Sequence, residues 1–191
     1  MKRIAWFAGL LVLAAPLSFA QATTWVSDQA HSEVDFSVSH LSISTVHGRF
    51  GKVNATVVYD QANIAKSSVK ATIDINSVQT GEEGRDKHLK TADFFDAASF
   101  PAATFASTSV AKSGNGLVVR GNLTLHGITK PVTLTVEGPK GPVEGMDRKL
   151  HAGFEATTTI SRTAFALGAK FPAAMVGDEI KLTIELDVAK Q

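Results

Sequence analysis

Apolar and polar residues alternate along most of the chain, which is the pattern of β-strands that bury one face. The clearest run extends from Ile180 to Val188, where Ile, Leu and Val alternate with Lys, Thr, Glu and Asp. The same alternation predicts strands over residues 34–40, 69–75, 117–125 and 132–136, and more weakly over 46–59, 104–112 and 150–161. We therefore expect about eight strands.

Glycine-containing turns separate these runs. The segments Ser113–Gly116 and His126–Gly127 predict tight hairpins, because glycine adopts positive φ without steric cost. The segment Gly138–Gly145, rich in Pro and Gly, predicts a longer connection. Because the connections are mostly local, we expect an all-β fold, an antiparallel up-and-down barrel of about eight strands. A β-sandwich is the alternative.

One segment interrupts the alternation and predicts a short helical insertion near residues 82–96. Its sequence favours a helix over residues 85–90, followed by a turn in which the Thr91 hydroxyl caps the next backbone amides. An apolar cluster follows, and we expect it to cover one end of the barrel; its members are Leu89, Phe94, Phe95 and Phe100.

The first 22 residues have the features of a signal peptide. Lys2 and Arg3 precede an apolar run over residues 4–15, and small residues then offer cleavage after Ala22 or after Ala20. The apolar run is too short to span a hydrocarbon core of about 30 Å. We expect export, with a signal peptide over 1–22 and one domain over 23–191.

Composition narrows the possible partners and anchors. The chain contains no cysteine, so it has neither a disulfide nor the cysteine on which a lipoprotein anchor is built. Loss of Lys2 and Arg3 with the signal peptide changes the formal net charge from +1 to −1. A nearly neutral domain argues against nucleic acid and against an anionic membrane surface as partners.

Alternation alone does not say which face of a barrel is apolar, since a transmembrane barrel has its apolar face outside. Only Trp25 and Tyr59 remain of the amphipathic aromatics after cleavage, too few for two interfacial girdles. The polar face carries Lys, Asp and Glu along whole strands, and the chain does not end in an aromatic residue. We expect a water-soluble barrel whose interior is either filled by side chains or open to a small ligand.

Motifs along the whole mature chain also resemble the YceI-like family, and they occur in the family's order. The resemblance is carried by Trp25-x-x-Asp28-x-x-His31-Ser32-x-Val34-x-Phe36-x-Val38-x-His40, Gly48-x-Phe50, Thr80, Arg85-Asp86-x-His88-Leu89, Asp93–Asp96, Phe100-Pro101, Gly121–Val132, Ile160-x-Arg162 and Val176–Ile180. Two departures are the acidic Glu33 and Asp35 on the first of these strands, and Ala164, where an acidic residue or asparagine is common before the phenylalanine.

The resemblance implies a lipocalin-like barrel in the bacterial periplasm that encloses a long apolar chain of the polyisoprenoid or fatty-amide type. The implied role is binding, storage or transport, with no established reaction. Apolar contacts barely discriminate between similar chains, so selectivity would come from tunnel length and from polar groups at the mouth.

Candidate ligand-binding residues follow from the inward faces of the predicted strands. The expected tunnel walls, each of which is equally compatible with ordinary core packing, are Val34, Phe36, Val38, Phe50, Ile73, Phe105, Leu123, Leu125, Leu134, Phe154 and Ile184. Arg85 or His88 could contact a ligand headgroup, although anchoring of the helix is the alternative role for both. Phe94 and Phe95 complete the expected lid.

Neither a metal site nor a catalytic site is expected. The six histidines are scattered, with no helical i,i+4 pair and no cysteine beside them. Arg85-Asp86-x-His88 lacks a nucleophile, and no G-x-S-x-G elbow occurs. We expect no enzyme and no cofactor, apart from a bound polyisoprenoid or quinone-like lipid as ligand.

Two functions remain open at this point. The first is a carrier or store for a hydrophobic small-molecule ligand. The second is a packed barrel that acts as a structural or partner-binding module beside a membrane electron-transfer protein. Neither reading involves nucleic acid or a membrane-embedded chain, and both leave room for a homodimer or a membrane protein partner.

Overall fold

The computed structural model describes residues 22–191, so the predicted signal peptide lies almost wholly outside the described residues. The first half of the domain forms six strands, with a kink or turn after each: β1 (Thr23–Ser27), β2 (Glu33–His40), β3 (Ser44–Phe50), β4 (Val53–Tyr59), β5 (Ser68–Asp74) and β6 (Val78–Gln79). A single short α-helix follows within the described residues, α1 (Glu83–Leu89).

The second half consists of five longer strands. These are β7 (Ala102–Ser113), β8 (Gly116–Leu125), β9 (Ile128–Glu144), β10 (Leu150–Ser161) and β11 (Val176–Lys190). Consecutive strands from β7 to β11 pair antiparallel, so this half of the sheet is a simple meander. The hairpins between β7 and β8 and between β8 and β9 confirm the two tight turns that the sequence predicts.

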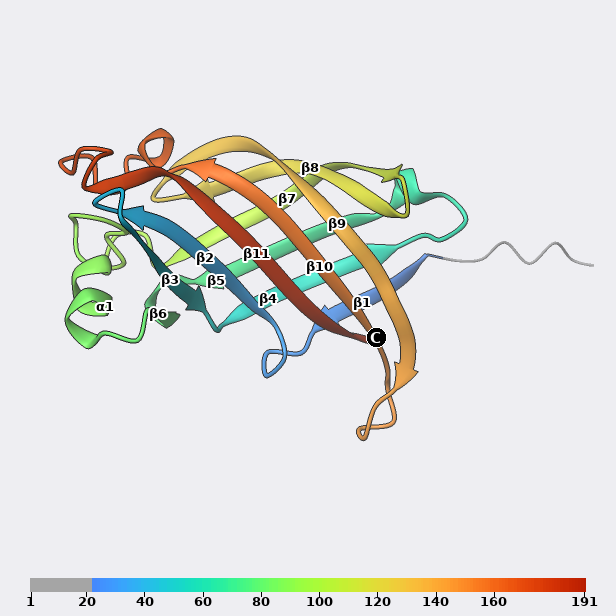
Figure 1. Cartoon of the computed structure of the whole chain (residues 1–191). Helices are drawn as coiled ribbons and strands as arrows, with labels where there is room; N and C mark the ends of the chain where they lie inside the picture. The colour runs from blue at the N-terminus through green and yellow to red at the C-terminus, as the bar shows by residue number, and fades with distance from the viewer. Residues whose placement is uncertain (1–21) are drawn as a thin grey trace, which may run out of the picture.

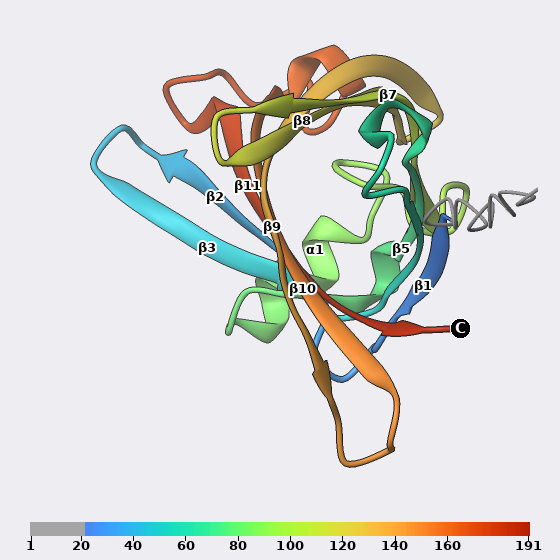
Figure 2. The same cartoon turned by 90° about the vertical axis from the view of Figure 1, so that its right-hand side faces the viewer.

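The sheet closes into an eight-stranded antiparallel barrel, which confirms the predicted fold. Around the ring the strand order is β1-β4-β5-β7-β8-β9-β10-β11, and β11 returns to β1 with Ser27 opposite Val188. Figure 2 shows the strands surrounding the barrel axis, with α1 seen beyond the far end of the ring. The strands of the ring follow one another in chain order, as expected of an up-and-down barrel, while β2, β3 and β6 lie outside the ring.

Three of the strands extend the wall beyond this ring. β11 pairs with β1 near its end and with β2 along most of its length, so β1 and β2 lie end to end against one long strand. β3 pairs with β2, and only Arg49 and Phe50 of β3 pair with β6. The β2–β3 hairpin therefore projects beside the barrel at the end that holds α1 (Figure 1).

Two segments without strands gather at this end of the barrel. The first is the insertion over residues 80–101, which contains α1, and the second is the loop over residues 162–175 between β10 and β11. Ring stacking between Phe94 and Phe171 joins the two segments, with 5.0 Å between centroids and an interplanar angle of 11°. The insertion therefore lies over the barrel end, as its apolar cluster predicts (Figure 1).

Three local predictions were wrong. The segment Gly138–Gly145 is not a loop, because β9 continues through it to Glu144 with register shifts opposite β10; prolines are tolerated in strands at such irregularities. The predicted strand over 46–59 is broken between Phe50 and Val53 into β3 and β4. The alternation also missed β1, which has only five residues.

Candidate functional site

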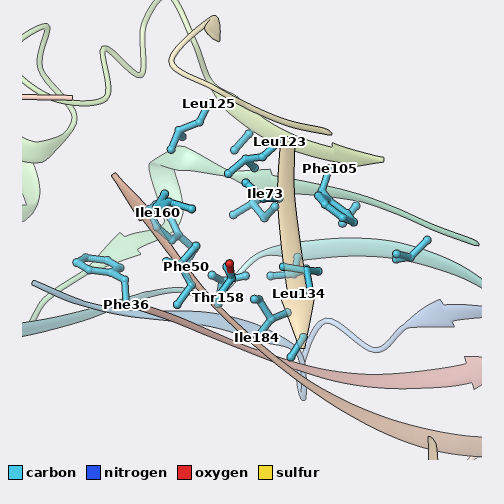
Figure 3. A pocket seen from close by; sticks show the side chains of 18 of the residues that line it. Phe36, Phe50, Ile73, Phe105, Leu123, Leu125, Leu134, Thr158, Ile160 and Ile184 are labelled. Carbon is cyan, nitrogen blue, oxygen red and sulfur yellow. The ribbon is translucent and has the colours of Figure 1, made fainter. Parts of the chain in front are cut away.

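An apolar cavity occupies the interior of the barrel, with a volume of about 240 Å³. It receives side chains from β2, β3, β4, β5 and all the strands from β7 to β11, and from the insertion that carries α1. Figure 3 shows side chains from opposite walls pointing toward a common space. Its volume lies just below the range of about 300–1,000 Å³ that is usual for ligand pockets.

Strand alternation makes the lining apolar. On β4, Val53, Ala55 and Val57 are buried and point inward, while Asn54 and Thr56 between them are exposed. The other strands repeat this division, which places charged and hydroxyl side chains in water and aliphatic ones inside. Small residues keep space open between the walls, since Ala71, Ala103 and Ala156 all line the cavity.

Aromatic rings close the cavity at the end beneath α1. Phe36 and Phe50 lie 5.6 Å apart between centroids, and Phe50 meets Phe95 edge-on at 5.5 Å. Phe94 and Phe95 both line the cavity from the insertion. Because rings in these arrangements attract beyond their buried area, the insertion is held to the barrel by the same groups that bound the cavity.

Hydrogen bonds to Thr80 fix the start of the insertion. Arg85 donates to the Thr80 hydroxyl at 2.7 Å and to the Thr80 carbonyl at 2.9 Å. The Asp86 carboxylate accepts from the Thr80 amide and hydroxyl. Glu82 caps α1 by accepting from the amides of Gly84 and Arg85. These contacts assign Arg85 to anchoring the helix.

Exposed ionic contacts also join the two segments at this end. Asp93 lies 2.6 Å from Lys170 and 2.8 Å from Nε2 of His88. The hydrogen bond from Lys170, followed by that from His88, lowers the pKa of the Asp93 carboxyl below its ordinary value. His88 also packs edge-on against Phe94 and Phe171. It therefore lies on the outer side of the aromatic cover, away from the cavity lining.

Arg162 organises the loop between β10 and β11. Its side chain is buried and donates to backbone carbonyls on both arms of the loop, those of Leu167, Gly168, Phe171, Val176 and Gly177. Although the residue borders the cavity, these carbonyls occupy its guanidinium. The motif Ile160-x-Arg162 thus serves to hold the loop in place.

The structure brings together all eleven of the expected tunnel-wall residues around this one cavity. Phe94 and Phe95 line it as well, whereas Arg85 and His88 do not. Contact of any of these residues with a ligand stays a prediction. Several further wall residues were not selected from the sequence, although most lie on the same alternating faces; they include Val57, Ala71, Val119, Val136, Ala156 and Leu182.

Such an arrangement has a limited chemical repertoire. An apolar chain placed against this lining would be removed from water, and each buried CH₂ group would contribute about 0.8 kcal/mol. Among residues 22–191, no three His, Asp or Glu side chains are grouped to hold a metal ion. No helix in the same range is long and apolar enough to cross a membrane.

Comparison with known proteins gives a consistent result. The model of the YceI-like domain matches residues 25–188. A UPF0312 protein of Vibrio parahaemolyticus is 38% identical over 188 residues, covering 95% of this chain and 97% of the relative. Protein YceI of Salmonella newport is 40% identical over 163 residues, covering 84% of this chain and 83% of the relative.

Solved structures show the same fold. BcnA of Burkholderia cenocepacia superposes with a TM-score of 0.72 at 30% identity, covering 84% of this chain and 98% of BcnA. A polyisoprenoid binding domain from Saccharophagus degradans superposes with a TM-score of 0.62 at 16% identity, covering 90% of this chain and all of that domain. With the family model matched over almost the whole described domain, the chain belongs to the YceI-like family.

Proposed function

We propose that this protein binds a long-chain isoprenoid or another amphiphilic lipid inside the barrel and stores or transports it. The observation that carries the proposal is the cavity, whose lining is mostly aliphatic and aromatic. Such walls take up a hydrocarbon chain without requiring any particular sequence of polar groups along it. The similar fold of a domain described as polyisoprenoid binding supports the same class of ligand.

An open interior favours this role over a packed partner-binding barrel. A filled barrel would bring facing side chains into contact, whereas here about 240 Å³ remains between them. Binding rather than catalysis fits the lining, because the Arg162 guanidinium at its edge is held by backbone carbonyls. A second copy of the chain or a membrane protein as partner stays a separate hypothesis.

Export to the periplasm belongs to the same proposal. It rests on Lys2, Arg3 and the apolar run that follows, with β1 beginning at Thr23, directly after the expected cleavage site. A periplasmic store would hold its lipid in water between two membranes. Mass spectrometry of the protein from a periplasmic extract should therefore give a polypeptide that begins at Thr23 or Gln21.

Native mass spectrometry of the same material, followed by organic extraction, tests binding. We expect a mass excess that organic solvent removes as a long-chain lipid. Ala156→Phe places a ring in the cavity and should abolish the excess, while Thr157→Phe, on the exposed face of the same strand, should retain it. An apoprotein mass that polyprenyl lipids leave unchanged would overturn the proposal.

A further inference from the structure

The cavity lining contains five polar residues among those that the structure describes, and they differ in what their polar atoms do: Tyr59, Ser67, Ser68, Thr158 and Arg162. Arg162 is bonded to backbone carbonyls, and the Ser67 hydroxyl accepts from the Asp60 amide at 3.0 Å. Tyr59 and Ser68 lie at the end of β4 and the start of β5, and Ser68 is exposed. Thr158 alone of the five lies along the middle of the barrel wall.

Thr158 occupies the central inward position of β10. The inward positions run Phe154, Ala156, Thr158, Ile160 and, just past the strand, Arg162, and all five border the cavity. In the ladder with β11, Thr158 lies opposite Leu182. Figure 3 shows its hydroxyl oxygen among apolar side chains, between Phe50 and Leu134. Within residues 22–191, this hydroxyl has no hydrogen-bond partner, and it is not sealed off from the cavity.

A hydroxyl without a partner in apolar surroundings is unfavourable. Valine has nearly the same shape and would remove the penalty, and the inward faces of the neighbouring strands use Val, Leu and Ile. The outward neighbours Thr157 and Thr159 are exposed, so their hydroxyls are free to bond water. Along the middle of the described barrel wall, Thr158 alone presents a hydroxyl to the interior, where water or a guest molecule can supply its partner.

We propose that Thr158 donates a hydrogen bond to a carbonyl oxygen of the bound lipid, and so selects a guest with a carbonyl deep in the barrel. This inference rests on the proposed function and narrows its ligand class. Apolar lining continues on both sides of Thr158, toward Phe154 and toward Ile160. The matching guest is therefore a long-chain lipid with apolar groups on both sides of a ketone, quinone, ester or amide carbonyl, rather than a plain hydrocarbon.

Displacement of the apolar fluorophore N-phenyl-1-naphthylamine by two probes of equal length tests this. Dodecan-6-one carries a carbonyl near mid-chain, and dodecane does not. Thr158→Val should lower the affinity for the ketone by about tenfold, which is the effect of one lost hydrogen bond. The same substitution should leave the affinity for dodecane unchanged or slightly higher. Thr158→Ser, which keeps the hydroxyl, should restore ketone affinity, and the outward control Thr157→Val should change neither probe.

A second readout reports the bond directly. The infrared carbonyl stretch of ¹³C-labelled dodecan-6-one should lie at a lower frequency in the native protein than in a hydrocarbon solvent, and it should move toward the hydrocarbon-solvent value in Thr158→Val. If Thr158→Val lowers the affinity for both probes equally, or for neither, the role of Thr158 is overturned while lipid binding stays intact. Failure of the native protein to bind either probe would instead overturn the proposed function and this inference together.

Discussion

The ring of Phe36 lies across the place where a side chain at Gly48 would project. The two residues are direct partners in the β2–β3 ladder, and a Cβ on Gly48 would clash with Cζ of Phe36. A glycine opposite an aromatic residue lets the ring fold over the backbone of the neighbouring strand. Phe36 is thereby placed at the border of the cavity instead of filling it.

Gly48→Ala should force the Phe36 ring toward the cavity. We expect a loss of about 1–3 kcal/mol in the free energy of unfolding, typical of overpacking, measured by urea denaturation. Gly51→Ala is the matched control, since no atom lies within 4 Å of its added methyl. Equal stability of the two variants would show that the ring moves freely away from Gly48.

Arg162→Met should strongly destabilise the loop between β10 and β11. The substitution leaves several buried carbonyls without donors, and we expect a cost of about 3 kcal/mol or more. Arg49→Met, which removes an exposed pair with Glu33 at 3.2 Å, should cost about 1 kcal/mol or less. Urea denaturation of both variants gives the comparison, and similar costs would contradict the assigned role of Arg162.

His151 should make stability depend on pH. Hydrogen bonds to Asp187 and then to Asp147 raise the pKa of His151 above its ordinary 6.5. Because the pKa is raised in the folded state, the stabilisation is complete below pH 6.5 and is lost as the pH rises through the folded-state pKa. The difference in unfolding free energy between native protein and His151→Asn should therefore shrink from pH 6 to pH 9. A difference that stays constant over this range would contradict the stabilising role of protonated His151.

Stacking of Phe94 on Phe171 should couple the insertion to the loop over residues 162–175. A double-mutant cycle with alanine at both positions should give a coupling energy of about 0.5–1.5 kcal/mol. Phe94 paired with Phe154 serves as the control, because Phe154 packs on Tyr59, a residue outside that stack; its effects should add within about 0.5 kcal/mol. Additive effects of Phe94 and Phe171 would show that the stack contributes no stability.

Much of the fold could be predicted from the sequence because each barrel strand meets water on one face. For this reason apolar and polar residues alternate with a period of two in β10 and β11, which separate interior from solvent along their whole length. The period does not reveal where one strand ends and the next begins, as between Phe50 and Val53. The chain changes direction there, but the alternation of polar and apolar residues shows no break. The period also fails in β9, where Pro139 and Pro142 resemble turn residues.

The cavity itself could not be predicted from the sequence. Alternation identifies inward residues such as Leu134 and Ile184, but whether facing residues touch depends on the distance across the barrel. The attachments of Arg85 and Arg162 were also hidden, because their partners are a threonine five residues earlier and a set of loop carbonyls. Thr158 was not selected from the sequence because its side chain is polar. Its inward position follows only from its place between Ala156 and Ile160, which point inward on the same strand.

The seam where β11 returns to β1 has a consequence for how the protein forms. Ser27 and Val188 belong to the first and last strands of the ring, so no nascent chain that lacks β11 contains the complete wall. Contacts between such distant segments slow folding, because the intervening chain must be ordered first. Until β11 pairs with β1, the faces that enclose the cavity are open to solvent, so closure of the interior depends on contacts between the two most distant strands of the ring.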